Sequence, residues 1–186
     1  PVLCYHQIRD WTEKDTRFQR QFILPVARFN EHMKALHDEG YTVISAEQLV
    51  DHYRLNIKLP AKAVVLTFDD GTVSQYRNAL PELEKYGYKA TFFIMTVTIG
   101  HEDYLTARQV KELYDEGNII GCHTWDHHSV TGYYSEKDWL TQLVQPLKQL
   151  EGITGNKILY FAYPNGMWDD DAMQHLKKNW AICIPR

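Results

Sequence analysis

Short apolar runs alternate with longer stretches of amphipathic pattern along the whole chain. The runs have the length and residue types of buried strands, whereas the stretches between them repeat apolar positions at helical spacing. We expect strands at Val2–His6, Tyr41–Ile44, Ala63–Phe68, Ala90–Met95, Asn118–Cys122, Ile158–Ala162 and Ala181–Ile184. We expect helices at Val26–Glu39, Ala46–Leu55, Val73–Tyr86, Ala107–Glu116, Glu136–Leu150 and Asp170–Asn179.

Three of these helices begin with a residue that can accept a hydrogen bond from the first helical turn. In each case a second polar residue stands three positions later, as in a capping box. The pairs are Ser45 with Gln48, Thr106 with Gln109, and Ser135 with Asp138. Glycine follows three of the helices, at Gly40, Gly87 and Gly117, where a left-handed residue often ends a helix.

Seven strands separated by six helices predict an α/β fold with a parallel sheet and helical crossovers. A closed barrel of parallel strands and an open doubly wound sheet both satisfy this order. In either fold, reactive side chains gather at the carboxyl ends of the strands. The length of 186 residues, with no internal repeat or long linker, agrees with a single domain over residues 1–186.

Composition excludes some classes of function. The hydrophobic content of 44% and the charged content of 24% are ordinary for a soluble globular protein. The net charge of −4, without a basic run, argues against a nucleic-acid or anionic-membrane surface. No apolar stretch approaches the roughly 20 residues of a membrane span. The chain opens at Pro1 inside a predicted strand and carries no signal peptide, so we expect a trimmed mature fragment.

The cysteines and the aromatic residues add little to this picture. Cys4, Cys122 and Cys183 lie in apolar, strand-like runs and lack the even number of a disulfide framework, so we expect buried free thiols. Aromatic residues make up 13% of the chain, with five Trp and twelve Tyr. They can stack on sugar rings, although most are expected in the core.

Two carboxylates follow the apolar strand Ala63–Phe68, at Asp69 and Asp70, with Gly71 after them. One of them could simply cap the next helix at a turn that the glycine relieves. Two carboxylates leaving a buried strand need a cation, hydrogen bonds or a shared proton. The pair therefore indicates a functional site.

Two histidines follow the strand Asn118–Cys122, at His123 and His127. A spacing of four residues can place both imidazoles on one side of a helical turn, as metal ligands often are. With Asp70 they make a set of two histidines and one carboxylate, which suits a divalent cation with positions left for water and substrate. Such a cation would acidify water and polarise a carbonyl, and Asp69 could accept the proton as a general base.

The runs Thr67–Gly71 and His123–His127 resemble the first two motifs of the polysaccharide deacetylases, or NodB-homology domains, and the resemblance extends over nearly the whole chain. It implies a distorted (β/α) barrel that hydrolyses N-acetyl groups of sugars. It also implies Asp69 as the base and a metal, most often Zn²⁺, on Asp70, His123 and His127.

The third motif departs from the common family pattern. Many members carry an Arg before a proline-containing turn, whereas this chain reads Phe161–Ala162–Tyr163–Pro164–Asn165–Gly166, with Ala162 in the place of the Arg. The turn is kept, so a backbone N–H near Asn165, with Tyr163 beside it, could still stabilise an oxyanion. How Asp69 is oriented without that Arg stays open.

The histidine motif that usually supplies the general acid late in the chain is absent after Ile158. His6 instead follows the first predicted strand, which resembles the circularly permuted branch that acts on poly-β-1,6-N-acetylglucosamine. There His6 would protonate the leaving amine; the alternative is a histidine bonded to a neighbouring loop. That branch often has an Arg after its last strand, so Arg186 could replace the missing partner of Asp69, or be no more than the chain end.

Other residues of the strand-end loops have weaker assignments. Trp125 and Trp168 could contact the sugar or the acetyl methyl group, or simply pack. Asp126 could orient an imidazole or lie on the surface. His128 is adjacent to His127, and only the spacing favours His127 as the ligand.

The resemblance implies an enzyme that deacetylates a β-linked N-acetylglucosamine polymer, with poly-β-1,6-N-acetylglucosamine favoured and chitin or peptidoglycan as alternatives. An O-acetyl esterase acting on xylan would use the same groups, and a carbohydrate-binding relative with an inactive site is a third possibility. The expected partner is an acetylated amino-sugar polysaccharide rather than a nucleic acid. Since such polymers lie outside the cytoplasm, we expect a secreted, periplasmic or surface-anchored protein.

Overall fold

The computed structural model describes residues 1–179 of the chain. Two features expected from the sequence, the strand Ala181–Ile184 and the role of Arg186, lie outside the described residues.

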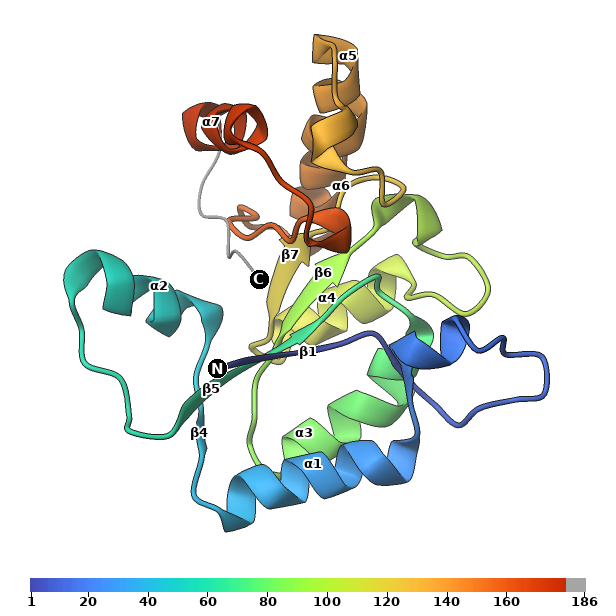
Figure 1. The fold of residues 1–186 in the computed structure, drawn as a ribbon, viewed down its shortest axis with the longest axis vertical. Helices are drawn as coiled ribbons and strands as arrows, with labels where there is room; N and C mark the ends of the chain where they lie inside the picture. The colour runs from blue at the N-terminus through green and yellow to red at the C-terminus, as the bar shows by residue number, and fades with distance from the viewer. Residues whose placement is uncertain (180–186) are drawn as a thin grey trace.

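A parallel sheet forms the centre of the molecule (Figure 1). Four strands lie in the order β1-β5-β6-β7, and the short β4 pairs with the start of β5. Their bounds are β1 Val2–Tyr5, β4 Thr42–Val43, β5 Ala63–Phe68, β6 Thr91–Ile94 and β7 Ile119–Cys122. Every pairing in the sheet is parallel, which confirms the expected α/β class.

Two short strands form a second, separate pair. They are β2 Gln7–Ile8 and β3 Ile23–Leu24, also parallel. The apolar pattern did not predict them, because two residues are too few to show a periodicity.

The strand expected at Ile158–Ala162 is wrong as a regular strand. Only Phe161 forms a β-bridge, with Cys122 at the edge of the sheet. Cys122 N donates to Tyr160 O at 2.9 Å, and Ala162 N donates to Cys122 O at 3.1 Å. Pro164 lacks an N–H and begins a tight turn, so only a short extended segment is left to pair with β7.

The helices follow the expected order, with the expected bounds for Ala46–Leu55 and Asp170–Asn179 and shifted bounds for the others. They are α1 Val26–Asp38, α2 Ala46–Leu55, α3 Leu80–Lys85, α4 Ala107–Asp115, α5 Glu136–Trp139, α6 Gln145–Thr154 and α7 Asp170–Asn179. Wider π-type turns at Gln75–Ala79 and Leu140–Val144 precede α3 and α6. Short 3₁₀ turns lie at Gln19–Phe22, Thr96–Thr98, Val130–Gly132 and Pro164–Gly166. Within residues 1–179, no helix combines the length and the apolar character that crossing a bilayer requires.

The helix starts and ends predicted from local sequence are confirmed. Ser45, Thr106 and Ser135 each accept a hydrogen bond from the backbone three residues later, and the side chain at that position bonds back. Gly40, Gly87 and Gly117 all have positive φ. These signals act within one turn, so the sequence alone carries them.

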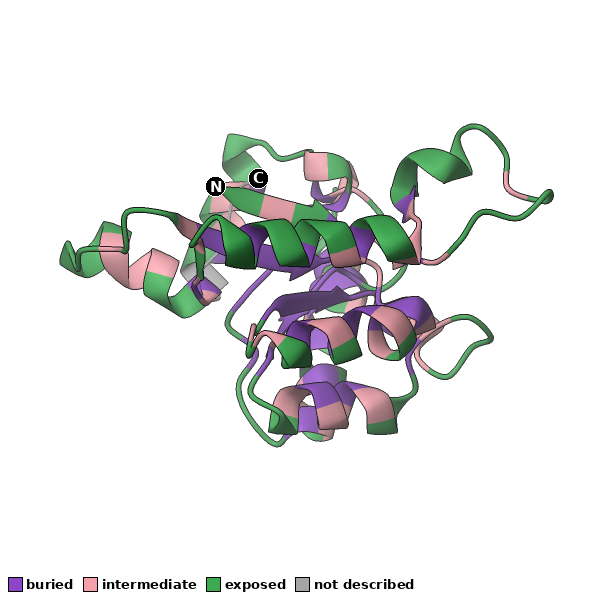
Figure 2. Ribbon diagram, turned by 90° about the horizontal axis from the view of Figure 1, so that it is seen from below, coloured by how far each residue is buried: buried purple, intermediate pink, exposed green. Residues whose placement is uncertain are grey.

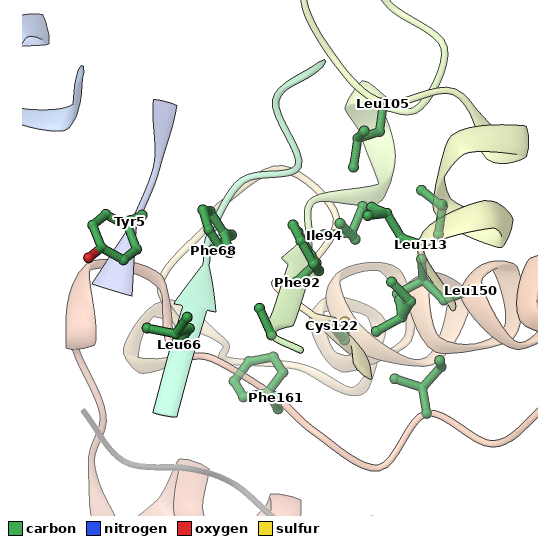
Figure 3. Packing of buried hydrophobic residues seen from close by; sticks show 14 of the residues in the cluster. Tyr5, Leu66, Phe68, Phe92, Ile94, Leu105, Leu113, Cys122, Leu150 and Phe161 are labelled. Atoms are coloured by element: carbon green, nitrogen blue, oxygen red, sulfur yellow. The ribbon is translucent and has the colours of Figure 1, made fainter. Parts of the chain in front are cut away.

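The core lies between the sheet and the helices, whose buried faces turn towards the strands (Figure 2). Phe68 of β5 stacks on Phe92 of β6 with ring centroids 4.9 Å apart, and Tyr5 of β1 stacks on Phe68 at 5.4 Å. Leu105, Leu113 and Leu150 extend this packing beyond β6 and β7 (Figure 3). Close packing of this kind holds the strand ends in a defined register.

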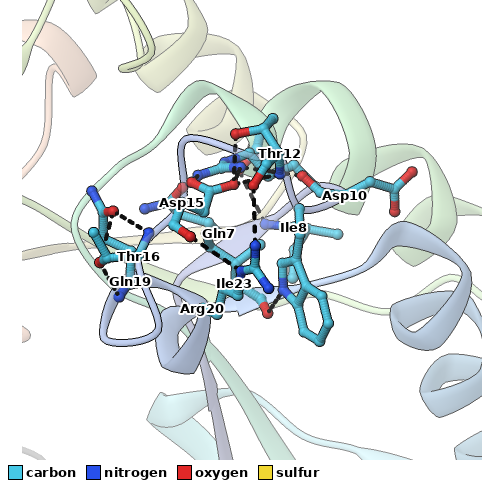
Figure 4. Close-up of polar contacts among 12 residues, drawn as sticks. Gln7, Ile8, Asp10, Thr12, Asp15, Thr16, Gln19, Arg20 and Ile23 are labelled. Atoms are coloured by element: carbon cyan, nitrogen blue, oxygen red, sulfur yellow. Dashed lines mark hydrogen bonds and ion pairs between the residues drawn. The ribbon is translucent and has the colours of Figure 1, made fainter.

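A long loop between β2 and β3 stands beside the carboxyl end of β1. Arg9 pairs with Asp15 through two hydrogen bonds of 2.8 and 2.6 Å, and Asp15 also accepts from the backbone N–H of Thr12 at 2.6 Å. The indole of Trp11 donates to Ile23 O at 3.2 Å (Figure 4). These contacts tie the loop to itself and to β3.

Candidate active site

The candidate site lies where β1, β5 and β7 end. His6 follows β1, Asp69 and Asp70 follow β5, and His123 follows β7. The backbone N–H of Asp69 donates to Tyr5 O at 2.9 Å, and that of His123 donates to Ile94 O at 3.0 Å. Because the strands are parallel, their carboxyl ends meet at one edge and bring these side chains together.

Asp70, His123 and His127 form one compact cluster. One potential ligand atom from each residue lies within 4.8 Å of the others. Asp70 Oδ1 is 3.5 Å from His123 Nε2 and 3.7 Å from His127 Nε2. The imidazole rings of His123 and His127 meet at 74° with centroids 4.8 Å apart. The structure therefore brings together the three residues that the sequence analysis assigned to a metal.

The proton arrangement at His123 shows what this cluster can hold. Its Nδ1 lies 2.8 Å from Ala162 O, and because a carbonyl can only accept, Nδ1 carries the proton. Burial lowers the pKa of His123, although the carboxylate of Asp70 opposes that shift, so the imidazole is neutral. Its Nε2 then presents a lone pair.

Two buried acceptor atoms consequently face each other across 3.5 Å. Among the described residues, neither His123 Nε2 nor Asp70 Oδ1 has a hydrogen-bond partner. Buried acceptor atoms without a hydrogen-bond partner lower the stability of the folded protein unless a cation or a donor satisfies them. A set of one carboxylate and two imidazoles fits a divalent cation such as Zn²⁺.

Asp69 lies next to this cluster and is only 1% exposed. Its Oδ2 is 3.8 Å from His123 Nε2. On the other side, Asp69 has potential ligand atoms of His6 and Cys4 within 4.8 Å. His6 is half-buried, and its ring lies 5.2 Å from that of Phe22. A buried carboxylate thus separates the three-residue cluster from a strand-end histidine.

Around the cluster of Asp70, His123 and His127, the backbone is unusual at three positions. Asp70, Thr124 and His127 adopt left-handed conformations with φ of 73°, 66° and 70°. Such residues cost on the order of 1–3 kcal/mol each and persist where the surrounding structure imposes them. The hydroxyl of Thr124 accepts a hydrogen bond from His127 N at 3.0 Å, which holds the turn that carries the second histidine.

Gln75 is a site residue that the sequence analysis missed. Its side chain is fully buried, and Nε2 donates to His6 O at 2.8 Å and also to Asp69 O. One amide group therefore joins the ends of β1 and β5. A glutamine in a predicted helix gives no sequence signal for this contact, because its partners come from two different strands.

The segment after the bridge at Phe161 joins the site through the Ala162 carbonyl. Tyr163 is buried, while Asn165 adopts a left-handed conformation with φ of 57° in the turn that follows. Trp125 and Trp168 are 39% and 51% exposed, which leaves both available for contact. The Ala162 carbonyl holds His123, an interaction that does not depend on the side chain at this position.

Asp126 and His128, on either side of His127, make local contacts outside the cluster of Asp70, His123 and His127. Asp126 Oδ1 accepts from His128 N at 3.1 Å, so Asp126 closes a turn rather than orienting an imidazole. The ring of His128 stacks on Tyr133 with centroids 5.9 Å apart. His127 faces Asp70, as its spacing from His123 suggested.

The expectation that Cys4 is a buried thiol is wrong. Cys4 is exposed, whereas Cys122 is completely buried, and Cys183 lies outside the described residues. Cys4 sits on β1, where the burial pattern of the strand reaches full burial only at Tyr5.

A pocket of about 490 Å³ opens beside the site, between the loop after β2 and the segment around Tyr104. Its lining includes Gln7, Arg9, Asp15, Thr72, Glu102 and Tyr104. Burial raises the pKa of the Tyr104 phenol, and the negative charges of Asp70 and Asp103 add to that effect. Polar and charged side chains make up most of the pocket lining.

Several known proteins resemble this chain over most of its length. Residues 56–180 match the sequence model of the family described as polysaccharide deacetylase. YxkH of Bacillus subtilis (strain 168), named for the polysaccharide deacetylases, is 30% identical over 178 residues, which cover 96% of this chain and 61% of YxkH. The chain thus spans less than two thirds of the length of that relative.

Two further similarities come from a curated protein and a solved structure. The poly-β-1,6-N-acetyl-D-glucosamine N-deacetylase of Staphylococcus aureus (strain MRSA252) is 27% identical over 198 residues, which cover 95% of this chain and 68% of that protein. The deacetylase PplD of Streptococcus pyogenes, solved in complex with acetate, superimposes with a TM-score of 0.86 at 27% identity. That superposition covers 96% of this chain and 79% of PplD.

Proposed function

The chain belongs to the polysaccharide deacetylase family, and from this premise we propose that residues 1–186 form a catalytic domain that removes N-acetyl groups from a β-linked N-acetylglucosamine polymer. The observation that carries the proposal is the cluster of Asp70, His123 and His127 with the buried Asp69 beside it. A buried carboxylate beside a set of metal ligands is typical of a catalytic site.

Asp70, His123 and His127 would hold the divalent cation. When bound, such a cation acidifies water and polarises the carbonyl under attack. Asp69 would accept the proton of the attacking water as the general base, since its carboxylate lies 3.8 Å from the nearest ligand nitrogen. Its burial keeps other protons and bulk water away from that carboxylate.

His6 would supply the proton that the leaving nitrogen needs. His6 lies on the opposite side of Asp69 from the cluster of Asp70, His123 and His127. The base and the acid would therefore face the substrate from the ends of two adjacent strands. Gln75 would hold the two backbones at a constant distance. A backbone N–H near Tyr163 and Asn165 would stabilise the developing oxyanion, and Trp125 and Trp168 would contact the sugar.

The substrate proposal rests on the relatives and on the pocket. The Staphylococcus aureus relative is named for poly-β-1,6-N-acetyl-D-glucosamine. Since a polymer extends beyond the reacting sugar, the polar pocket lined by Arg9 and Tyr104 offers a place for the adjoining unit. Trp11 and Phe18, both exposed on the neighbouring loop, add surfaces on which sugar rings can stack. We propose an extracytoplasmic location, where such polymers are found.

Acetate release from defined oligomers tests this function. The purified protein is stripped of metal, reloaded with Zn²⁺, and given β-1,6-linked N-acetylglucosamine oligomers, chitin oligomers and acetylated xylan. Release that requires Zn²⁺ and is largest on the β-1,6 substrate is the expected result. Release from xylan alone would favour an O-acetyl esterase, and no release from any substrate would indicate an inactive, carbohydrate-binding relative.

Replacing His6 with Ala should slow amide hydrolysis far more than hydrolysis of an activated ester. The amide needs a proton on its leaving nitrogen, whereas an activated alkoxide leaves without one. A positioned acid contributes about 10²- to 10⁴-fold, so we expect a loss in that range on the amide and much less on the ester. The measurement is kcat on both substrates for the wild type and the variant. Equal losses on the two would contradict the general-acid role.

A further inference from the structure

Cys4, His6 and Asp69 form a second cluster of potential metal ligands, separate from the first. One ligand atom from each lies within 4.8 Å of the other two. The cluster shares no residue with Asp70, His123 and His127. It consists of one sulfur, one nitrogen and one oxygen donor, the three types found in zinc sites.

The geometry of two neighbouring strands produces this cluster. Cys4 and His6 are two residues apart on and after β1, and alternate residues of an extended chain point to the same face. Cys4 pairs with Thr67 and Tyr5 with Phe68, so the register continues to His6 beside Asp69. Tyr5, between the two ligands, points the other way and packs on Phe68 in the core.

We propose that Cys4, His6 and Asp69 bind a second Zn²⁺ ion, which inhibits the enzyme. The inhibitory role rests on the proposed function, because Asp69 and His6 are the base and the acid of that reaction. A cation on these two side chains occupies the lone pairs through which they accept and deliver protons. The site itself follows from the ligand set and does not depend on the reaction.

Charge determines the order in which the two sites fill. On binding, the thiol of Cys4 releases its proton to solvent, since the thiolate is the metal ligand. The thiolate and the carboxylate together then neutralise the charge of a divalent ion, which allows the ion to bind close to the first site. The two sites are near each other, since Asp69 Oδ2 lies 3.8 Å from His123 Nε2. The cost of removing the thiol proton near neutral pH, together with repulsion from a cation already held by Asp70, His123 and His127, makes the second site the weaker one.

The sulfur ligand also determines which metals inhibit. Thiolates favour Zn²⁺ and similar soft or borderline ions, whereas Mg²⁺ and Ca²⁺ favour oxygen ligands. Excess Zn²⁺ should therefore inhibit, and excess Mg²⁺ should not. Access is open because Cys4 is exposed, unlike the fully buried Cys122.

Cobalt substitution tests the site without any reference to activity. The metal-free protein is titrated with Co²⁺ under nitrogen, with no thiol reductant, and the near-ultraviolet spectrum is recorded. The first equivalent should bind to a carboxylate and two imidazoles and give no thiolate-to-cobalt charge-transfer band. The second equivalent should produce that band. Cys4→Ser should abolish it, while Cys183→Ser, which leaves Cys4 in place, should keep it.

The same variants test whether metal binding at Cys4 inhibits the enzyme. For each protein, acetate release at high Zn²⁺ is divided by release at one equivalent. We expect this ratio to be below 1 in the wild type and in Cys183→Ser. In Cys4→Ser, the Zn²⁺ concentration needed for inhibition should rise at least about 10-fold, because even the loss of a group that only orients a metal ligand lowers metal affinity by about 10-fold or more.

Three results would overturn the inference. The absence of a charge-transfer band in the wild type at any Co²⁺ concentration would exclude the site, as would a band that persists in Cys4→Ser. A band accompanied by unchanged acetate release would exclude the inhibitory role. If the wild type released no acetate at all, the proposed deacetylase function would fail, while the spectrum would still decide whether Cys4 binds metal.

Discussion

Replacing Asp69 with Asn is expected to lower kcat by about 10²- to 10⁴-fold while the protein keeps its metal. The amide has nearly the volume of the carboxylate, so the buried position is filled, but it cannot accept the proton of the attacking water. The three proposed ligands, Asp70, His123 and His127, stay unchanged. The measurement pairs the rate of acetate release with the zinc content after dialysis.

Asp126→Asn is the matched control for that variant. Asp126 belongs to the same group of strand-end loops, but its carboxylate accepts a hydrogen bond from the backbone of His128 in an exposed turn. We expect activity close to that of the wild type. If Asp69→Asn kept nearly full activity with its zinc in place, Asp69 would not be the base.

Replacing His123 with Ala should remove zinc binding and activity together. The variant loses the neutral imidazole nitrogen that faces Asp70 Oδ1 at 3.5 Å. It also leaves the Ala162 carbonyl without its 2.8 Å partner in a fully buried place, which costs on the order of 1–3 kcal/mol of folding free energy. Zinc content, acetate release and thermal unfolding are measured on the same preparation.

A second substitution separates loss of metal from loss of folding. His127 is about a third exposed, and its side chain should be easier to remove without disturbing the core. His127→Ala should lower zinc affinity and activity with little change in thermal unfolding, whereas His128→Ala should keep both zinc and activity. Zinc retained by His127→Ala and lost from His128→Ala would exchange the roles of these two residues.

Much of the candidate site could be predicted because its residues lie directly after strands. The end of β5 carries Asp69 and Asp70, and the end of β7 leads into His123. Once alternation of apolar runs and helices predicts a parallel sheet, the carboxyl ends of its strands must share an edge. The choice of His127 over His128 followed from spacing, and the structure turns His127 towards Asp70.

Local features were predictable for a related reason. The capping boxes at Ser45, Thr106 and Ser135 involve residues three positions apart, so no distant part of the chain decides them. By contrast, the two-residue strands β2 and β3 and the single bridge at Phe161 depend on partners elsewhere in the chain. Short segments carry too little pattern to reveal such partners.

The sequence by itself determined the α/β class, the order of most elements and the residue types gathered at one sheet edge, since periodicity and strand ends are local properties. Only the tertiary structure decided which groups surround them. The Ala162 carbonyl fixes the proton of His123, and Gln75 joins the ends of β1 and β5. Cys4 reaches Asp69 because of the register between these strands, and a shift of one residue would turn it to the opposite face.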